Sequence, residues 1–311
     1  MIKSSKFKGF ILMENFILIL LAILIGYVLR RLNIFSKDAP TILNQFVIYI
    51  SLPAMILLQI PKLSFSIDTI IPVIVSYLVM GISIIIVLGL SKVLNFSREV
   101  TGSLLLVSIL TNSSFLGIPI INAYMGDVAM PYVLVYDQVG TFIMLATYGT
   151  FIASYYSNKN EVSFKTITLK VLSFPPFIAL IVSLFLMGVE FNITISKVLE
   201  NLALTIVPIA LVAVGLQLQF KLPREDIKPF SVAIIIKLII APIIAFIVCF
   251  VFGWDNLASK VSIMEASMAP MITAGAIASM AGLAPRLSSA IVGYGILMSF
   301  ITSFIVFNLI S

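Results

Sequence analysis

Long uninterrupted runs of apolar residues dominate this chain. Hydrophobic residues make up 61% of its 311 residues and charged residues only 10%, whereas a soluble domain carries about 25% charged residues. A helix that crosses a bilayer needs about 20 apolar residues. Ten stretches approach this length, at approximately 15–32, 41–60, 70–92, 99–123, 131–155, 167–187, 197–218, 227–252, 258–281 and 287–310. Because the apolar residues form blocks and do not alternate, they predict an all-α membrane protein with ten transmembrane helices and exclude a membrane β-barrel.

Several residue types needed for familiar chemistry are missing from the sequence. The chain has no histidine, which excludes the usual zinc sites, Ser-His-Asp triads and haem ligation by histidine. Its single cysteine, Cys249, lies within an apolar block and indicates neither a disulfide framework nor a metal site. The longest polar stretch, 157–165, is too short for a soluble catalytic domain. We therefore expect no enzyme activity, no cofactor and no metal.

The net charge of +6 is explained by membrane topology and does not indicate nucleic-acid binding. Twelve of the nineteen basic residues fall in the loops after helices 1, 3, 5, 7 and 9, namely Arg30, Arg31, Lys37, Lys92, Arg98, Lys159, Lys165, Lys170, Lys221, Arg224, Lys228 and Arg286. The opposite side holds Lys62, Lys197 and Lys260, with Lys3, Lys6 and Lys8 in the N-terminal tail. Since basic loops stay in the cytoplasm, both termini are predicted outside the cell membrane.

The first dozen residues are basic and then apolar. A cleaved signal peptide is one interpretation, but no small-residue cleavage site separates this stretch from the first helix. An uncleaved tail is the favoured interpretation, and a translation start at Met13 is the alternative.

Prolines recur in a pattern that indicates an internal repeat. Pro53 and Pro119 lie in the second and fourth apolar blocks, 66 residues apart. Pro208 and Pro270 lie in the seventh and ninth blocks, 62 residues apart. Because each half contains five helices, an odd number, the second half enters the membrane inverted, as in many secondary transporters. We predict a 5+5 inverted repeat, with residues 1–155 as the first half and 166–311 as the second.

The fourth and ninth helices are predicted to break and cross near the middle of the membrane. Proline removes a backbone donor, and in lipid such a break survives only where protein or a wet cavity satisfies the freed groups. Half-helix N-termini meeting at one point would favour an anion such as a carboxylate. The candidate substrate-binding residues are Asn112, Ser113, Ser114, Gly117, Pro119, Ser267 and Pro270, with Pro53 and Pro208. The alternative is that the prolines only kink their helices and that the polar residues join neighbouring helices.

Three ionisable residues fall within apolar blocks: Asp137, Lys237 and Glu265. Each costs about 2.5–3.5 kcal/mol at a helix centre on insertion scales, so such groups usually face the protein interior. We expect them, with Gln138, to couple transport to an ion or to contact substrate. A structural salt bridge is the alternative.

Two strings resemble the auxin efflux carrier family, which includes plant auxin exporters and bacterial transporters of malate or malonate. Residues 44–53, NQFVIYISLP, resemble the family's N-x-F-V-x-Y-x-x-x-P in helix 2, and residues 112–119, NSSFLGIP, resemble its helix-4 signature. Gln138 falls where the family has a glutamine in helix 5. Lys237 before Pro242 in helix 8, and Glu265 to Pro270 in helix 9, are similar to weaker family features. Glu265 stands where plant members have a glutamine, and the long cytoplasmic loop of many plant members is missing.

The resemblance implies a small organic anion as substrate and elevator-like movement. Helices 1, 2, 6 and 7 would form a scaffold, compatible with a homodimer, and helices 3–5 and 8–10 would form a moving transport domain. Coupling to protons or sodium varies within the family. The alternatives are a sodium-coupled symporter of the bile-acid type, and a passive channel or sensor on a transporter-like scaffold. No nucleic-acid partner is expected.

Overall fold

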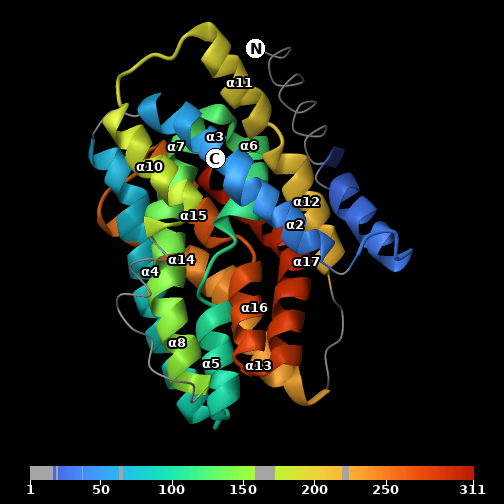
Figure 1. Ribbon diagram of the computed structural model, residues 1–311. Coiled ribbons are helices and arrows are strands. Elements are labelled where there is room, and N and C mark those ends of the chain that lie inside the picture. Colours follow the sequence, from blue (N-terminus) through green and yellow to red (C-terminus); the bar gives the residue numbers. More distant parts are fainter. Residues whose placement is uncertain (1–16, 19, 37, 63–65, 158–171, 219–223) are drawn as a thin grey trace.

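The computed structural model describes residues 17–18, 20–36, 38–62, 66–157, 172–218 and 224–311. Over these ranges the chain is helical, and the helices stand mostly side by side along one long axis (Figure 1). Within the described ranges, no strand is present and extended pairing is confined to a single isolated bridge. The all-α expectation therefore holds for this part of the chain.

Six continuous helices in the described ranges are long and apolar enough to cross a membrane. They span Ala39–Lys62, Asp68–Val93, Asp127–Ser157, Ile193–Gln217, Arg224–Val251 and Pro285–Ile310. Their labelled parts are α2 (Ala39–Phe46), η1 (Val47–Ser51), α3 (Leu52–Gln59), η2 (Ile60–Lys62), α4 (Ile67–Val93), η4 (Asp127–Ala129), α7 (Met130–Val135), η5 (Tyr136–Phe142), η6 (Leu145–Gly149), α8 (Thr150–Ser157), α11 (Ile193–Ala203), α12 (Ile206–Gln217), η7 (Arg224–Asp226), α13 (Ile227–Ile235), η8 (Ile236–Ile240), α14 (Ala241–Val251) and α17 (Pro285–Ile310).

The other four apolar blocks contain shorter helical pieces. Residues 20–31 are helical, and α10 covers Pro175–Phe185. The fourth block is divided into α5 (Arg98–Val107), η3 (Ser113–Gly117) and α6 (Ile118–Met125), and the ninth into α15 (Leu257–Ala266) and α16 (Ile272–Met280). Helices 4 and 9 are therefore broken, as predicted. The two-fold inverted repeat remains a prediction.

A π-helical turn precedes three of the intramembrane prolines at the same spacing. The π turns η1, η3 and η8 end two residues before Pro53, Pro119 and Pro242, respectively. Proline lacks the N–H that would close an ordinary helical turn, and its ring clashes with the carbonyl four residues back. A wider turn just before the ring relieves that clash, which explains why these helices continue through their prolines.

The helices pack in two groups. In the first group α3 contacts α10 and α11, and α2 contacts α12. The helix over 20–31 joins this group through Gly26 and Gly215, where a Cβ on Gly26 would lie 2.3 Å from the Val212 carbonyl oxygen. In the second group α4 contacts α14 and α15, while α16 contacts α5 and α17. Small residues thus bring the first helix and α12 into backbone contact.

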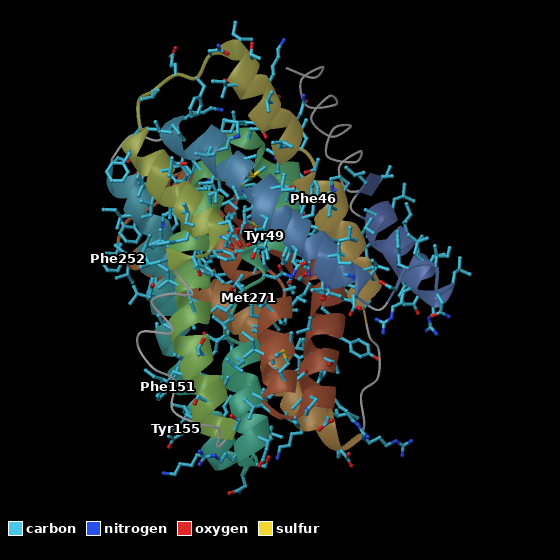
Figure 2. All side chains as sticks on the ribbon, viewed as in Figure 1. Phe46, Tyr49, Phe151, Tyr155, Phe252 and Met271 are labelled. Atoms are coloured by element: carbon cyan, nitrogen blue, oxygen red, sulfur yellow. The ribbon has the colours of Figure 1, made fainter. Side chains whose placement is uncertain are left out.

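Large apolar side chains cover the outside of the bundle. Figure 2 labels several of them, and Phe46, Tyr49, Phe151, Tyr155 and Phe252 are all exposed. A soluble monomer rarely exposes so large an apolar surface, but lipid tails cover it without cost. The exposed apolar belt is therefore the lipid-facing surface of a multi-pass membrane protein.

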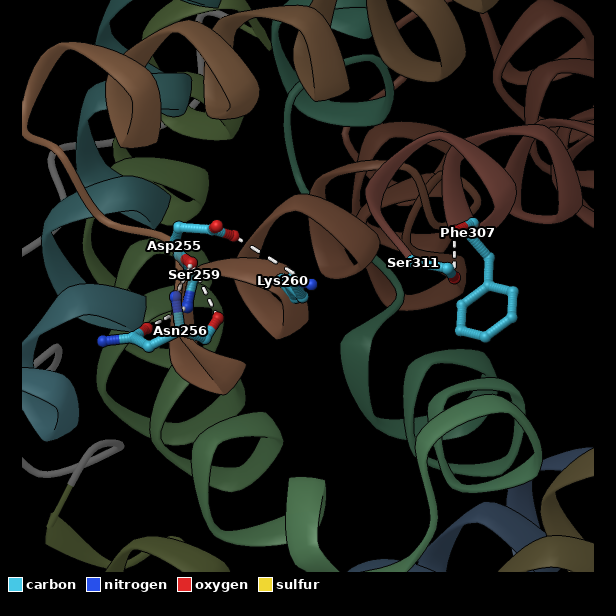
Figure 3. Close-up of polar contacts among 6 residues, drawn as sticks. All are labelled: Asp255, Asn256, Ser259, Lys260, Phe307 and Ser311. Atoms are coloured by element: carbon cyan, nitrogen blue, oxygen red, sulfur yellow. Dashed lines mark hydrogen bonds and ion pairs between the residues drawn. The ribbon is translucent and has the colours of Figure 1, made fainter. Parts of the chain in front are cut away.

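The start of α15 is tied to the rest of the bundle by polar contacts. Asn256 and Ser259 form a reciprocal capping box, and Lys260 lies 4.0 Å from Asp255 (Figure 3). The Asn256 amide also donates to Asp68 Oδ1 at 2.6 Å, at the start of α4. This cap satisfies the N–H of Ser259, one of the free N–H groups at the start of the helix, and holds the first half of the broken ninth helix in place.

Candidate functional site

The two broken helices meet at their breaks and pair with each other there. Thr111 and Pro270 form an antiparallel bridge. The Asn112 backbone N–H donates to the Ala269 carbonyl at 2.9 Å, and the Met271 N–H donates to the Leu110 carbonyl at 2.9 Å. The backbone groups freed by the two breaks therefore satisfy one another, which is how unwound backbone is tolerated at membrane depth.

Four helix ends converge on this crossing. The helices α5 and α15 end just before it, at Val107 and Ala266, and η3 and α16 begin just after it, at Ser113 and Ile272. Helix N-termini carry partial positive charge and C-termini partial negative charge. The crossing thus presents two positive and two negative ends within a buried region, and ionic groups of either sign find a complementary partner there.

Lys237 supplies a positive charge to the negative ends of the crossing. Its side chain comes from the π turn η8 and is fully buried. The Nζ atom donates to Thr111 Oγ1 at 2.6 Å and to the Ala266 carbonyl, the last residue of α15, at 3.4 Å. Among the described residues it forms no ion pair with Glu265 or Asp137, so the salt bridge considered above is absent from this part of the structure.

Asp137 is a buried acid whose oxygens are well supplied with donors. The hydroxyls of Ser113 and Ser114 donate to Oδ1, the latter at 2.6 Å, and the Gln138 amide donates to Oδ2. Ser113 and Ser114 open η3, so this carboxylate is bound to the N-terminal end of the half-helix after the break. Three donors stabilise an ionised carboxylate, and these serine hydroxyls are therefore engaged with Asp137.

Glu265 is buried in a contrasting environment. Its side chain is fully buried, and neither carboxylate oxygen has a hydrogen-bond partner among the described residues. The carboxylate lies against Gly117: a Cβ placed on that glycine would be 2.5 Å from Oε1. A buried carboxylate without donors is costly, so Glu265 requires a proton or a cation at this position.

Two further polar atoms at the crossing lack partners in the described ranges. They are the Asn112 side-chain Nδ2, a donor, and the Gln138 Oε1, an acceptor. Both residues are almost completely buried. Unsatisfied buried groups of this kind are rare in folded proteins and mark places where a ligand, ion or water binds.

The remaining candidate residues occupy varied positions. Ser267 is buried and donates to the Met264 carbonyl in its own chain segment, and Pro270 lies at the bridge against Gly295, where a Cβ would be 2.5 Å from the proline ring. Pro119 is buried within the first turn of α6, beyond the break. Pro53 is half-buried, and Pro208 is exposed on α12.

A cavity of about 550 Å³ opens between the two groups of helices. One wall comes from the first helix and the end of α12, with Arg30 and Gln217, and the other from α16 and α17, with Gly275 and Ser289. Ile272, the first residue of α16, also lines it. The cavity therefore reaches the beginning of the half-helix that follows the crossing.

Comparison with known proteins places this architecture in a family. A family model described as membrane transport protein matches residues 11–307. The chain belongs to this family. This finding confirms the resemblance to auxin efflux carriers found in the sequence.

Two archaeal relatives agree with this membrane transport family. An uncharacterized transporter of Methanocaldococcus jannaschii is 27% identical over 265 residues, covering 82% of this chain and 85% of the relative. An uncharacterized transporter of Methanothermobacter thermautotrophicus is 24% identical over 273 residues, covering 85% and 87%. The protein is thus a multi-pass membrane protein of a transporter family.

Sequence reasoning missed three residues that matter in this membrane transport protein. Thr111 accepts a hydrogen bond from Lys237. Its place directly before the candidate residue Asn112 was the signal that could have identified it. Gly295 makes room for Pro270, but nothing local in the sequence distinguishes it from other helical glycines. Arg30 was counted only as a topology charge, yet it lines the cavity.

Proposed function

We propose that the protein is a secondary transporter that moves a small organic anion bearing a carboxylate across the cell membrane. The observation that carries this proposal is the paired crossing, because it places two half-helix N-termini together at one buried point. Such ends favour negative charge. In carriers with broken helices, they bind the anionic group of the substrate.

The polar groups left open at the crossing support a carboxylate ligand. The Asn112 Nδ2 lacks an acceptor among the described residues, and a substrate carboxylate would supply one. The ammonium of Lys237 donates to the hydroxyl of Thr111, the residue before Asn112, and its positive charge would attract a substrate carboxylate. Because Ser113 and Ser114 are bonded to Asp137, they hold the half-helix in position and leave Asn112 as the side chain that binds substrate.

The cavity supports alternating access by an elevator-like movement. It lies between the group built on α2, α3 and α10–α12 and the group that contains the crossing. We assign helices 1, 2, 6 and 7 to a fixed scaffold, which would also carry any homodimer contact, and helices 3–5 and 8–10 to the moving domain. Residues 1–155 and 166–311 form the two inverted halves in this proposal.

Counterflow in proteoliposomes tests the proposal. Vesicles loaded with unlabelled malonate, malate, succinate or indole-3-acetate would be assayed for uptake of the corresponding labelled acid. Saturable uptake that requires an exchange partner supports a carrier. Conductance that neither saturates nor needs an exchange partner would contradict the carrier and favour a passive channel.

A matched pair of asparagine variants tests the binding residue. Asn112→Leu removes the open donor at the crossing, and we expect it to raise the KM strongly. Asn308→Leu is the control, because Asn308 is exposed on α17 and its amide donates to the Phe304 carbonyl of the same helix. Equal transport by both variants would remove Asn112 from the substrate site.

A sodium-coupled symporter is the second candidate, and Glu265 favours it. Its two carboxylate oxygens and the Gln138 Oε1 lack partners among the described residues, and oxygen atoms are the ligands that small hard cations prefer. The counterflow assay should therefore be repeated with and without sodium and with a pH gradient. Steep dependence on sodium would select the symporter, and dependence on the pH gradient alone would assign Glu265 a proton.

A further inference from the structure

We propose that Arg30 is an anion-recruiting residue, which attracts the substrate carboxylate into the cavity from its open side. This inference rests on the proposed transport of an organic anion. It goes further because it assigns a selectivity group outside the crossing, on the opposite wall of the cavity.

Arg30 lines the cavity without another charged side chain among the described lining residues. Among the described residues that line the cavity, Arg30 alone is charged, and the other polar groups are neutral: Asn33, Ser36, Gln217, Ser279 and Ser289. A single charge in a concave space with low-dielectric walls raises the local concentration of oppositely charged solutes. An anion entering this cavity therefore meets one cation and no competing carboxylate among the described lining residues.

Arg30 is held in place by the end of a neighbouring helix. Its Nη1 donates to the Leu216 carbonyl at 3.1 Å and to the Leu218 carbonyl at 2.8 Å. The close approach of Gly26 and Gly215 fixes the first helix against α12 just before this point. Because guanidinium is planar and carries five N–H donors, the anchoring of Nη1 leaves Nη2 and Nε to receive a carboxylate.

The neighbouring Arg31 has the environment expected of a basic residue that only sets membrane orientation. It is exposed, it does not line the cavity, and it donates through Nε and Nη2 to the Tyr27 hydroxyl four residues earlier. If Arg30 served only to keep this end of the helix in the cytoplasm, the two residues would be equivalent. The cavity contact of Arg30 makes them different, and Arg31→Gln is the matched control.

The first test measures the electrostatic potential in the cavity without any transport. Ser279 on α16 lines the cavity and is changed to cysteine in a Cys249→Ala background, which removes the native buried thiol. The purified full-length protein in detergent is treated with a negatively or a positively charged methanethiosulfonate of similar size. Each rate is divided by the rate of the same reagent with a small free thiol, because the anionic thiolate is the reacting form and favours the cationic reagent even in water. The normalised ratio, anionic over cationic, reports the local potential.

We expect this normalised ratio to exceed one in the presence of Arg30. Arg30→Gln should lower the rate ratio severalfold at low salt, because one unit charge in the cavity shifts the rates of an anionic and a cationic reagent in opposite directions. Arg30→Lys and Arg31→Gln should preserve the ratio. The preference should fade at about 1 M salt, where the Debye length is roughly 3 Å. A ratio at or below one with Arg30 present, or one unchanged in Arg30→Gln, would overturn the proposal.

The second test separates recruitment from helix capping. Arg30→Gln removes the charge and shortens the side chain that donates to the Leu216 and Leu218 carbonyls. If recruitment is the main role of Arg30, the melting temperature of this variant should stay near that of the wild type. In counterflow with labelled malonate, Arg30→Gln should raise the KM severalfold and leave kcat unchanged, whereas a capping role predicts a lower melting temperature with an unchanged KM. If the wild type transports none of the carboxylates, the proposed function fails, while the thiol assay still decides whether Arg30 attracts anions.

Discussion

At the crossing, a carboxylate occupies the space that the methyl group of an alanine would need in place of a glycine. Gly117 in η3 has no Cβ, and the Glu265 carboxylate occupies that volume, with Oε2 at 2.6 Å from the ideal Cβ position. This contact joins the second half of helix 4 to the first half of helix 9. The absence of a side chain at residue 117 therefore determines how closely the two broken helices approach.

Gly117→Ala should accordingly displace the Glu265 side chain. Overpacking of this kind costs about 1–3 kcal/mol, so we expect a lower melting temperature and weaker transport. The control is Gly89→Ala in α4, where a Cβ would meet nothing within 4 Å. Adding Glu265→Ala to Gly117→Ala should restore much of the lost thermal stability, and two independent, additive effects would contradict the contact.

Lys237 should be indispensable for turnover. Its removal leaves Thr111 and the Ala266 carbonyl without their donor and the negative helix ends without a cation. We expect Lys237→Ala to abolish counterflow and Lys237→Arg to keep part of it. The wild type should show little dependence on sodium, since the ammonium already supplies a positive charge at the crossing.

Normal transport by Lys237→Ala would assign this lysine a purely structural role. Thr111→Val is the companion variant, because it removes the 2.6 Å acceptor and keeps the side-chain shape. It should weaken transport less than Lys237→Ala, since the Ala266 carbonyl remains available.

At the scale of elements, the two prolines of the broken helices have different positions. Pro270 lies in the extended pairing itself, opposite Thr111. Pro119 lies in the first turn of α6, after a π turn that already accommodates its ring. The sequence suggested the same role for both, but the structure places only Pro270 in the break.

Pro270→Ala should therefore reduce transport more than Pro119→Ala does. Alanine supplies an N–H and favours helix, so α15 can extend through the bridge and close the crossing. We expect a fall of an order of magnitude or more in counterflow for Pro270→Ala and a modest fall for Pro119→Ala, with similar amounts of both variants in the membrane. Wild-type rates for Pro270→Ala would mean that this proline only kinks its helix.

At the scale of the whole molecule, the charge distribution predicts orientation. The loop that contains Asn158 and Asn160 should face the cytoplasm, although it lies outside the described residues. Asp127, which opens η4, should face the outside. In a Cys249→Ala background, a cysteine at Asp127 should react with an impermeant maleimide in intact cells, and one at Asn160 should react only after permeabilisation. The opposite pattern would invert the topology.

Local sequence patterns were enough to predict the class of the molecule and the helices that break. Hydrocarbon cannot satisfy exposed backbone groups, so long apolar blocks have to become helices. The polar and small residues around Asn112 and Pro270 likewise indicated interrupted helices, because such residues within an apolar block need a protein or water environment. These inferences depend on local pattern, which a single chain carries in full.

Which atoms contact one another became known from the packing of the helices in the three-dimensional structure. It pairs Thr111 with Pro270 and bonds Lys237 to Thr111 and Ala266, where a salt bridge was the alternative. It also sets Glu265 against Gly117, with no donor to its carboxylate among the described residues. The structure also shows that Arg30, which the sequence analysis used only to predict membrane orientation, lines the cavity. Each of these contacts joins residues far apart in the chain, and their distances depend on how whole helices pack. No local pattern of residues contains that information.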